Sequence, residues 1–283
     1  MIPFLNGHHV SLLREPLGVT AHIIPWNYPA QMIGRTVAPA LAMGNATVLK
    51  PAEDTSLSAL RLAEIAAAGL PDGALNVVTG LGEEAGAALA ARPGIALISF
   101  TGSNEVSTLV QQAAAKNAVK CVLELGGKSP QIVFADADID RAVPIIVKAI
   151  VQNAGQTCTA GSRLLVEQKA FAKVRVGTPE MDLDRGPVMN PAQRARVNRY
   201  IDAAHAAGIP LLAQGQIAPD VPAGGYDVRP ALFGGRAHRV AKAVRAGQVF
   251  GKCYGAGAVS SCPSAAPSAA ATAARRACSR SRN

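Results

Sequence analysis

The sequence has few aromatic residues and no long apolar run. Aromatic residues make up 4% of its 283 residues, and Trp26 is the only tryptophan, so we expect an aliphatic core. No stretch has enough unbroken apolar residues to span a bilayer. The start, MIPFLNGHHV, lacks the basic segment and the continuous apolar segment of a secretion signal. We therefore expect a cytoplasmic protein with no membrane partner.

Cysteine pairs and metal-ligand spacings are also missing. The five cysteines form no CxxC pair, which argues against a disulfide framework and against a structural zinc site. The five histidines show no metal-ligand spacing either. The pattern predicts a reducing compartment and no bound metal.

Acidic residues are fewer than basic ones, and the formal net charge is +9. Much of the excess lies near the C-terminal end, and no basic patch interleaved with aromatic residues marks a nucleic-acid surface. From Ala258 the chain is a low-complexity run of Ala, Ser and Arg, which is typical of a disordered tail. We expect no nucleic-acid partner.

From Pro16 onward, short β-branched segments alternate with longer Ala-rich amphipathic segments, as in a parallel sheet with crossover helices. The expected strands lie at 18–24, 46–50, 74–79, 95–100, 119–125, 131–134 and 163–167. The expected helices span 29–43, 56–68, 83–91, 105–115, 138–153, 191–207 and 236–246. The pattern predicts an α/β protein with a doubly wound, Rossmann-like parallel sheet in residues 1–127, a second, incomplete α/β domain with internal gaps in residues 128–257, and a disordered tail at 258–283.

Polar residues collect directly after the expected strands, where such a sheet binds its ligands. They are Asn27, Lys50, Glu53, Ser103 and Glu124. Each also has a plain structural explanation. Asn27 could be a turn former and Ser103 a helix N-cap. Lys50 and Glu53 could form a solvated pair, and Glu124 could pair with Lys128.

The segment VQNAGQTCTAGSR, residues 151–163, places Cys158 among small and polar residues directly after an apolar helical segment. A thiol in a Gly-rich turn is a candidate nucleophile. The alternative is a small buried hydrophobic side chain, which is what a single cysteine often is.

Taken together, the motifs PWNYP, KPAE, FTGS, LELGGKSP and GQTCTAGSR resemble the aldehyde dehydrogenase superfamily from about Glu15 to Arg163. The segments HIIPWNYPAQM and NAGQTCTAGSR are similar to its betaine-aldehyde and broad-substrate branches. The resemblance implies NAD-dependent oxidation of a small-molecule aldehyde to a carboxylic acid. Cys158 would attack the aldehyde, forming a thiohemiacetal and then a thioester. The Asn27 amide would stabilise the oxyanion, and Glu124 would activate the hydrolytic water.

The resemblance also implies the cofactor residues. Lys50 and Glu53 would contact the adenosine ribose of NAD, where a carboxylate repels the 2′-phosphate of NADP. Gly102 and Ser103 would offer backbone N–H groups to the pyrophosphate. Gly80 and Trp26 would line the same cleft. Residues 1–127 would then be the NAD-binding domain and residues 128–257 the catalytic thiol domain.

The sequence departs from the family in several places, and one of them is Ser107, which stands where the family usually has glycine. It lacks the section that precedes REPLGV, it is shortened between Glu167 and Val176, and at ALFGGRAHRV it lacks the family's glutamate for the nicotinamide ribose. The residues after 258 can be encoded by bases that yield a family-like segment in a shifted reading frame. We therefore expect an N-terminally truncated chain with a frameshift near residues 255–259. A genuine Ala/Ser/Arg extension is the alternative, and the DNA sequence distinguishes the two.

Two other functions remain open. The missing segments suggest a catalytically impaired NAD-binding remnant. A Cys158 nucleophile with a Glu124 partner would also suffice for acyl transfer without redox chemistry. The family's homo-oligomer draws on segments that this chain lacks, so its exposed sheet edges would instead promote aggregation.

Overall fold

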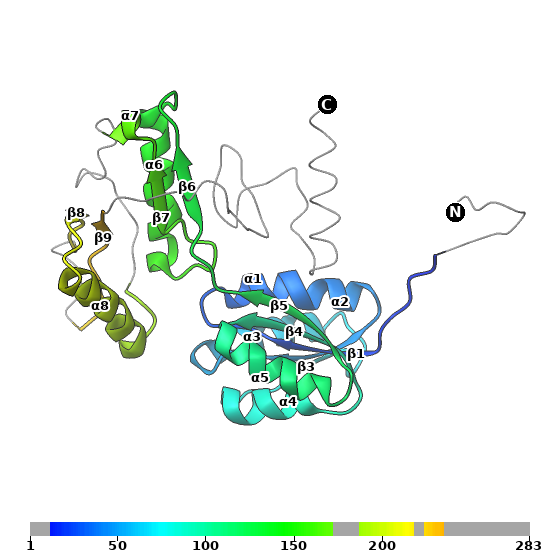
Figure 1. Cartoon of the computed structure of the whole chain (residues 1–283). Coiled ribbons are helices and arrows are strands. Elements are labelled where there is room, and N and C mark those ends of the chain that lie inside the picture. Colours follow the sequence, from blue (N-terminus) through cyan, green and yellow to red (C-terminus); the bar gives the residue numbers. More distant parts are fainter. Residues whose placement is uncertain (1–11, 172–186, 218–223, 235–283) are drawn as a thin grey trace, which may run out of the picture. The chain divides into compact units, whose positions relative to one another are not determined.

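The computed structural model describes residues 12–171, 187–217 and 224–234. The chain divides into two compact units, Met1–Leu125 and Gly126–Asn283. The first unit contains the large sheet, and the second contains smaller sheets with their helices (Figure 1). The predicted helix at 236–246 and the predicted tail at 258–283 lie outside the described residues.

The first unit is built on a five-stranded, fully parallel sheet. Its strands are β1 (Val19–Ile23), β2 (Ala46–Lys50), β3 (Leu75–Val77), β4 (Ile95–Gly102) and β5 (Lys120–Leu125). Their spatial order is β3-β2-β1-β4-β5, with parallel pairing throughout. The order reverses between β1 and β4, which is the switch point at which sheets of this kind bind ligands.

One face of the sheet is covered by the helices that follow β1 and β2. The first is a continuous stretch of α1 (Pro29–Met32), the π-helical turn η1 (Ile33–Val37) and α2 (Ala38–Ala42). The second is α3 (Ser56–Ala67). Met32, Val37 and Ala59 from these helices form one buried cluster with Ile24 and Leu49. The predicted helix at 29–43 is therefore confirmed, except that its middle turn is π-helical.

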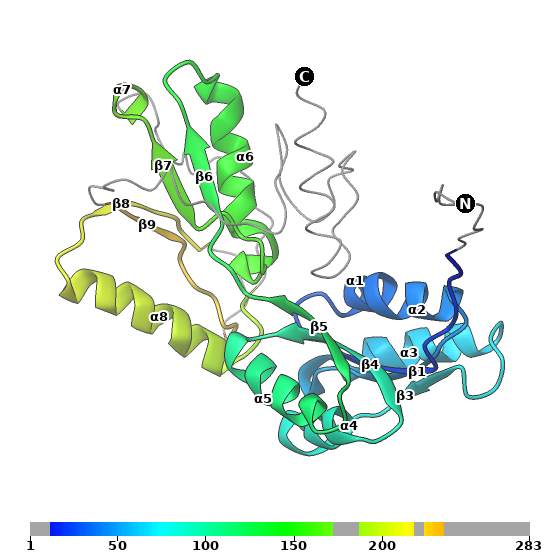
Figure 2. The same ribbon diagram turned by 45° about the vertical axis from the view of Figure 1, so that its right-hand side comes forward.

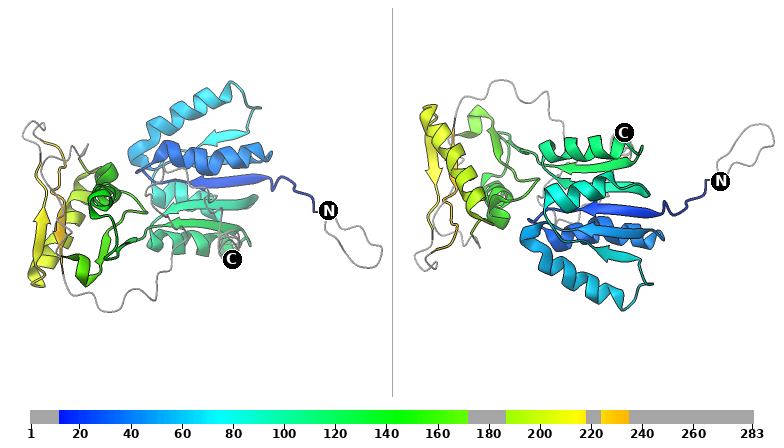
Figure 3. Two further views of the ribbon diagram at one scale, coloured as in Figure 1. Left: turned by 90° about the horizontal axis from the view of Figure 1, so that it is seen from above. Right: turned by 90° about the horizontal axis from the view of Figure 1, so that it is seen from below.

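The opposite face is covered by the helices that follow β3 and β4. They are η3 (Gly82–Gly86) with α4 (Ala87–Ala91), and α5 (Asn104–Ala115). Ala90 and Val110 from these helices pack in a second cluster with Ala21, Ile98 and Phe100 of the sheet. Figures 1 and 3 show α1 and α2 on one side of the sheet and α4 and α5 on the other. Because apolar side chains are buried on both faces, the doubly wound α/β prediction is confirmed.

The second unit begins with a βαβ element (Figure 2). Strands β6 (Pro130–Val133) and β7 (Arg163–Val166) pair in parallel and are connected through α6 (Ile139–Val151) and the 3-10 turn η4 (Gln152–Gly155). A short helix, α7 (Gln168–Phe171), follows. Helix α8 (Pro191–Ala206) accompanies the antiparallel pair β8 (Leu211–Gln214) and β9 (Ala231–Phe233).

Capping residues set the ends of these helices. Asp138 and Asn190 accept hydrogen bonds from backbone N–H groups in the first turns of α6 and α8. Gly44 follows α2 with a φ of +77°, which glycine adopts without strain. Among the described helices, none is long and apolar enough to cross a membrane.

Candidate active site

The carboxyl ends of the five parallel strands carry all the site residues that the sequence predicts in the first unit. Trp26 and Asn27 follow β1, and Gly80 follows β3. Lys50 ends β2, and Glu53 comes shortly after it. Gly102 ends β4 and precedes Ser103, and Glu124 lies near the end of β5. Since parallel strands end at one edge of a sheet, the fold brings these residues to a single edge. That edge contains the switch point between β1 and β4.

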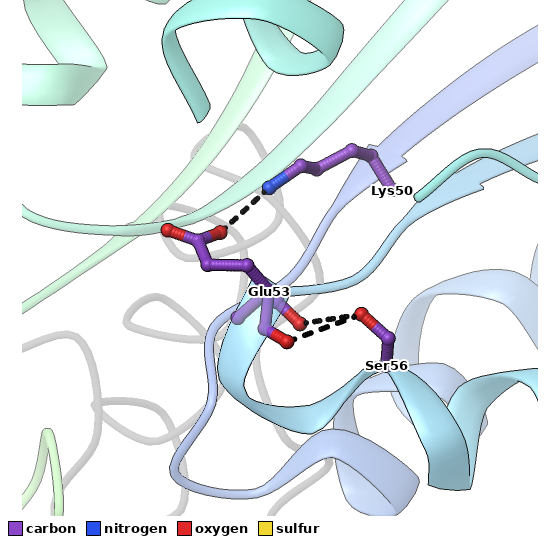
Figure 4. A network of polar contacts seen from close by, with 4 residues as sticks. Lys50, Glu53 and Ser56 are labelled. Atoms are coloured by element: carbon purple, nitrogen blue, oxygen red, sulfur yellow. Dashed lines mark hydrogen bonds and ion pairs between the residues drawn. The ribbon is translucent and has the colours of Figure 1, made fainter. Parts of the chain in front are cut away.

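Lys50 and Glu53 form an ion pair at the end of β2 (Figure 4). The Lys50 Nζ atom lies 3.0 Å from the Glu53 Oε2 atom, in the 3-10 turn η2 (Glu53–Thr55). Lys50 is only 3% exposed, whereas Glu53 is 51% exposed, so the pair is not a solvated surface pair. The pKa of Glu53 is lowered below its usual value, mainly by a hydrogen bond from its own backbone and also by the hydrogen bond and positive charge of Lys50. Partial burial opposes this shift. Glu53 is therefore an anion at neutral pH, and about half of its side chain is exposed to water.

Ser103 is the N-cap of α5, as its structural explanation predicted. Its Oγ atom accepts a hydrogen bond of 3.2 Å from the Val106 backbone N–H. The N–H groups of Asn104 and Glu105, at the start of the helix, have no acceptor within the helix itself. This arrangement is compatible with an anion near the start of α5, because the helix dipole favours negative charge there.

Gly102 lies directly against the ring of Phe100, which is buried in the core. A Cβ atom at position 102 would lie 2.5 Å from the Phe100 Cζ atom. Gly102→Ala must displace this ring, and we expect a loss of about 1–3 kcal/mol in unfolding free energy, measured by urea titration. Gly34→Ala is the matched control, because a Cβ there meets no atom within 4 Å and Ala favours a helix. Equal stabilities of the two variants would contradict the close packing.

Glu124 pairs with Arg35 rather than with Lys128, so the predicted structural partner was wrong. The Arg35 Nη2 atom lies 3.1 Å from the Glu124 Oε1 atom, and the side chains are 30% and 36% exposed. The Lys128 Nζ atom instead donates to the Gly127 carbonyl oxygen. Arg35 is on η1, above the same sheet edge. No sequence motif marks Arg35, although it is the one charged residue between Pro29 and Met43.

Thr101, the threonine of the FTGS motif, also lies at this edge, although the motif implied no role for it. It is the register neighbour of Glu124 on β4 and is 9% exposed. Its Oγ1 atom is buried and has no hydrogen-bond partner in the described part of the chain. Such a hydroxyl costs stability unless a ligand or water satisfies it.

Asn27, Trp26 and Gly80 occupy loops at the same edge. Asn27 and Trp26 are half-buried in the bend between β1 and α1. Gly80 has a φ of +142°, and a Cβ there would lie 3.0 Å from the Ala85 side chain. The turn after β3 therefore needs glycine both for its backbone angle and for its space.

Cys158 lies in a hydrogen-bonded turn of the second unit, half-buried and with a free thiol. The Ala160 N–H donates to the Thr157 carbonyl across this turn. Three consecutive residues before it, Asn153, Ala154 and Gly155, have φ values of 51°, 55° and 76°. Two of them are not glycine, and such left-handed backbone persists only where the surroundings hold it. The chain therefore turns sharply out of α6 just before the thiol.

The motif GQTCTAGSR is fastened to the motif LELGGKSP within the second unit. The Ser129 N–H donates to the Ala160 carbonyl at 3.2 Å, and the Arg163 Nε atom donates to the Lys128 carbonyl at 2.6 Å. A Cβ at Gly127 would lie 3.4 Å from the Cys158 carbonyl oxygen. Gly161 sits against the Gln131 side chain, whose amide donates to the Gly161 carbonyl at 2.8 Å. These contacts hold the turn that carries Cys158.

The predicted residues thus fall into two groups. The first-unit residues share one sheet edge, and Cys158 shares a loop cluster with residues 127–131. Asn27 and Glu124 belong to the first unit and Cys158 to the second. No group of three or more His, Cys, Asp or Glu side chains suited to a metal occurs among the residues that the structure describes.

Comparisons with known proteins extend over most of the chain. The profile described as "Aldehyde dehydrogenase family" matches residues 1–242, a wider range than the one that the motifs cover. A "Hydroxyisobutyraldehyde dehydrogenase" from Mycolicibacterium austroafricanum is 45% identical over 241 residues, which are 80% of this chain and 48% of the relative. The predicted frameshift at 255–259 lies outside both the matched range and the described residues, and stays a prediction.

Solved structures also resemble the chain. A crystal structure of a Burkholderia cenocepacia protein provisionally named an aldehyde dehydrogenase is 57% identical, with a TM-score of 0.74, covering 78% of this chain and 49% of that one. The crystal structure of PnpE in complex with nicotinamide adenine dinucleotide is 41% identical, with a TM-score of 0.71, covering 78% and 48%. The chain thus spans about half the length of the relatives it matches. With the profile matched over 1–242, the chain belongs to the aldehyde dehydrogenase family.

Proposed function

We propose that this chain carries the NAD site and the nucleophile of an aldehyde dehydrogenase, which oxidises a small-molecule aldehyde to a carboxylic acid. The observation that carries the proposal is the set of polar residues at the carboxyl edge of the β3-β2-β1-β4-β5 sheet, on both sides of its switch point. Family membership supplies the reaction, and the relatives' names supply the aldehyde and the cofactor.

Cys158 is the proposed nucleophile. Its thiolate attacks the aldehyde carbon, a C–S bond forms, and the carbonyl oxygen becomes an oxyanion. The Asn27 side-chain amide and the Cys158 backbone N–H donate hydrogen bonds to this oxyanion. The anchored turn around Cys158 supports this role, because a nucleophile fixed in position loses less freedom on reaching the transition state.

Glu124 is the proposed general base for the second half of the reaction. It accepts a proton from the water that attacks the thioester carbon, the C–S bond breaks, and the proton returns to the departing Cys158 thiolate. The carboxylic acid leaves, and the thiol is restored. Glu124 is half-exposed, so water can reach it.

The first-unit edge also fits a dinucleotide. The start of α5 offers N–H groups to a pyrophosphate, and the buried Thr101 hydroxyl has no described partner. Glu53 is anionic beside the buried Lys50, so it favours a ribose hydroxyl and repels the 2′-phosphate of NADP. Trp26 and Gly80 lie at the same edge. NAD held at this edge would supply the hydride acceptor for the oxidation of the thiohemiacetal to the thioester.

The test combines binding with turnover. We expect NAD to change Trp26 fluorescence and raise the thermal midpoint, with NADP weaker. We expect NADH absorbance to appear with an aldehyde panel that includes a small hydroxyaldehyde and betaine aldehyde.

The outcomes separate the alternatives. NAD binding without NADH formation would favour the impaired NAD-binding remnant. Thioester turnover that needs no nicotinamide would favour the acyl-transfer enzyme. Unchanged fluorescence and unchanged stability at millimolar NAD would contradict the cofactor site.

A further inference from the structure

We infer that Arg35 is a positioning residue, which fixes the orientation of the Glu124 carboxylate for thioester hydrolysis. The inference rests on the proposed function. Arg35 and Glu124 come from elements far apart in the sequence, η1 and β5, and meet at 3.1 Å over the sheet edge.

The π-helical turn accounts for the placement of Arg35. Met32 and Val37 are five positions apart, yet both are buried in the same cluster. In an α-helix, residues five apart point roughly 140° away from each other, so only one of them would face that cluster. The wider turn Ile33–Val37 lets both side chains reach the core, while Arg35 between them meets Glu124. Single π-helical turns of this kind are frequent at functional sites.

The geometry fixes one carboxylate oxygen and leaves the other available. Arg35 contacts the Oε1 atom of Glu124 through its Nη2 atom. The Oε2 atom has no polar partner within the described residues, so it can accept a proton from water. Both side chains are about one-third exposed, so water screens the pair and the carboxylate is oriented without strong Coulombic stabilisation. Without a partner, a Glu side chain at this exposure would sample several rotamers, so its carboxylate would have the required orientation only part of the time.

The test uses 4-nitrophenyl acetate, which needs no nicotinamide. The Cys158 thiolate displaces 4-nitrophenolate and becomes an acetyl thioester, which water then hydrolyses to acetate and the free thiol. A burst of 4-nitrophenolate reports acylation, and the later steady rate reports hydrolysis. We expect Arg35→Met to keep the burst and to lower the steady rate by about 10-fold. Arg35→Lys, which keeps the charge, should recover most of the rate.

Glu124→Gln decides whether Arg35 acts through Glu124. In that background, Arg35→Met should cause no further loss. Arg61→Met is the matched control, because Arg61 forms an exposed ion pair with Glu64 at 2.9 Å on α3. It should leave both phases unchanged.

Each other result overturns a distinct claim. The positioning role alone is overturned if wild type and Arg35→Met have equal steady rates. It is also overturned if Arg35→Met lowers the steady rate by the same factor in the wild-type and Glu124→Gln backgrounds. A parallel fall of burst and steady rate, with a lower melting temperature, shows a structural role and overturns it as well. A wild-type chain that gives no burst overturns the thioester mechanism itself and the positioning role with it.

Discussion

Cys158→Ala is expected to reduce NADH formation from an aldehyde by on the order of 10⁴-fold or more, down to background, because it removes the nucleophile on which both half-reactions depend. The fold should survive, because Cys158 is half-buried and its turn is held by backbone and by Arg163 rather than by the thiol. NAD binding, followed through Trp26 fluorescence, should therefore be retained. The measurement is NADH absorbance, with aldehyde and NAD both saturating.

Cys121→Ala is the matched control. Cys121 lies on β5 and is also a half-buried thiol, but burial raises its pKa above the usual value, which disfavours the thiolate. Cys121→Ala should keep wild-type turnover.

The rate of NADH formation by Asn27→Ala should fall between those of Cys158→Ala and Cys121→Ala. We expect a loss of about 10²–10³-fold, because the substitution removes one oxyanion donor and leaves the nucleophile. If Cys158→Ala kept a tenth of the wild-type rate, Cys158 would not be the nucleophile.

Much of the first unit could be predicted from the sequence because its signals are local. A β-branched run such as ATVLK pairs on both sides and is buried on both faces, so its composition alone indicates a strand of a parallel sheet. The site residues follow the strands directly, so predicting the strands also predicts the edge that carries Lys50 and Ser103. The π-helical turn at Ile33–Val37 was missed, because its cause is the packing of Met32 and Val37 against a distant cluster.

The partners of the site residues were harder to predict than their positions. Lys128 lies only four positions from Glu124 along the chain, yet Arg35 meets Glu124 because η1 passes over the end of β5. The alternative of a solvated Lys50–Glu53 pair was also wrong for Lys50, which is 3% exposed in the sheet beside β1. Both errors concern contacts between segments far apart in the sequence, which no local pattern records.

The burial of His22 is another result of contacts between segments far apart in the sequence. It is a β1 side chain with 1% exposure, and its register neighbours are Leu49 on β2 and Ser99 on β4. The Nε2 atom lies 2.9 Å from the Thr20 hydroxyl, while the Nδ1 atom has no partner in the described part of the chain. Burial lowers the pKa of His22 from 6.5 to about 4. The ring is therefore neutral in the folded protein at neutral pH.

This burial makes the stability of the first unit depend on pH. Between about pH 6.5 and pH 4 the unfolded chain binds a proton at His22 that the folded chain does not, so the free energy of unfolding falls as the pH is lowered through this window. The His22 contribution to the loss should reach about 3 kcal/mol near pH 4 and should be absent above about pH 7. Urea unfolding followed by Trp26 fluorescence measures it.

His22→Leu should remove that part of the pH dependence, because leucine does not titrate and the Thr20 hydroxyl keeps its bond of 3.2 Å to the Ala46 carbonyl. The variant should therefore be more stable than wild type near pH 4.5. The exposed His205 provides the control, and His205→Gln should retain the wild-type slope. Identical slopes in wild type and His22→Leu would contradict this prediction, because they would mean that water or a charged group reaches His22 in the folded state.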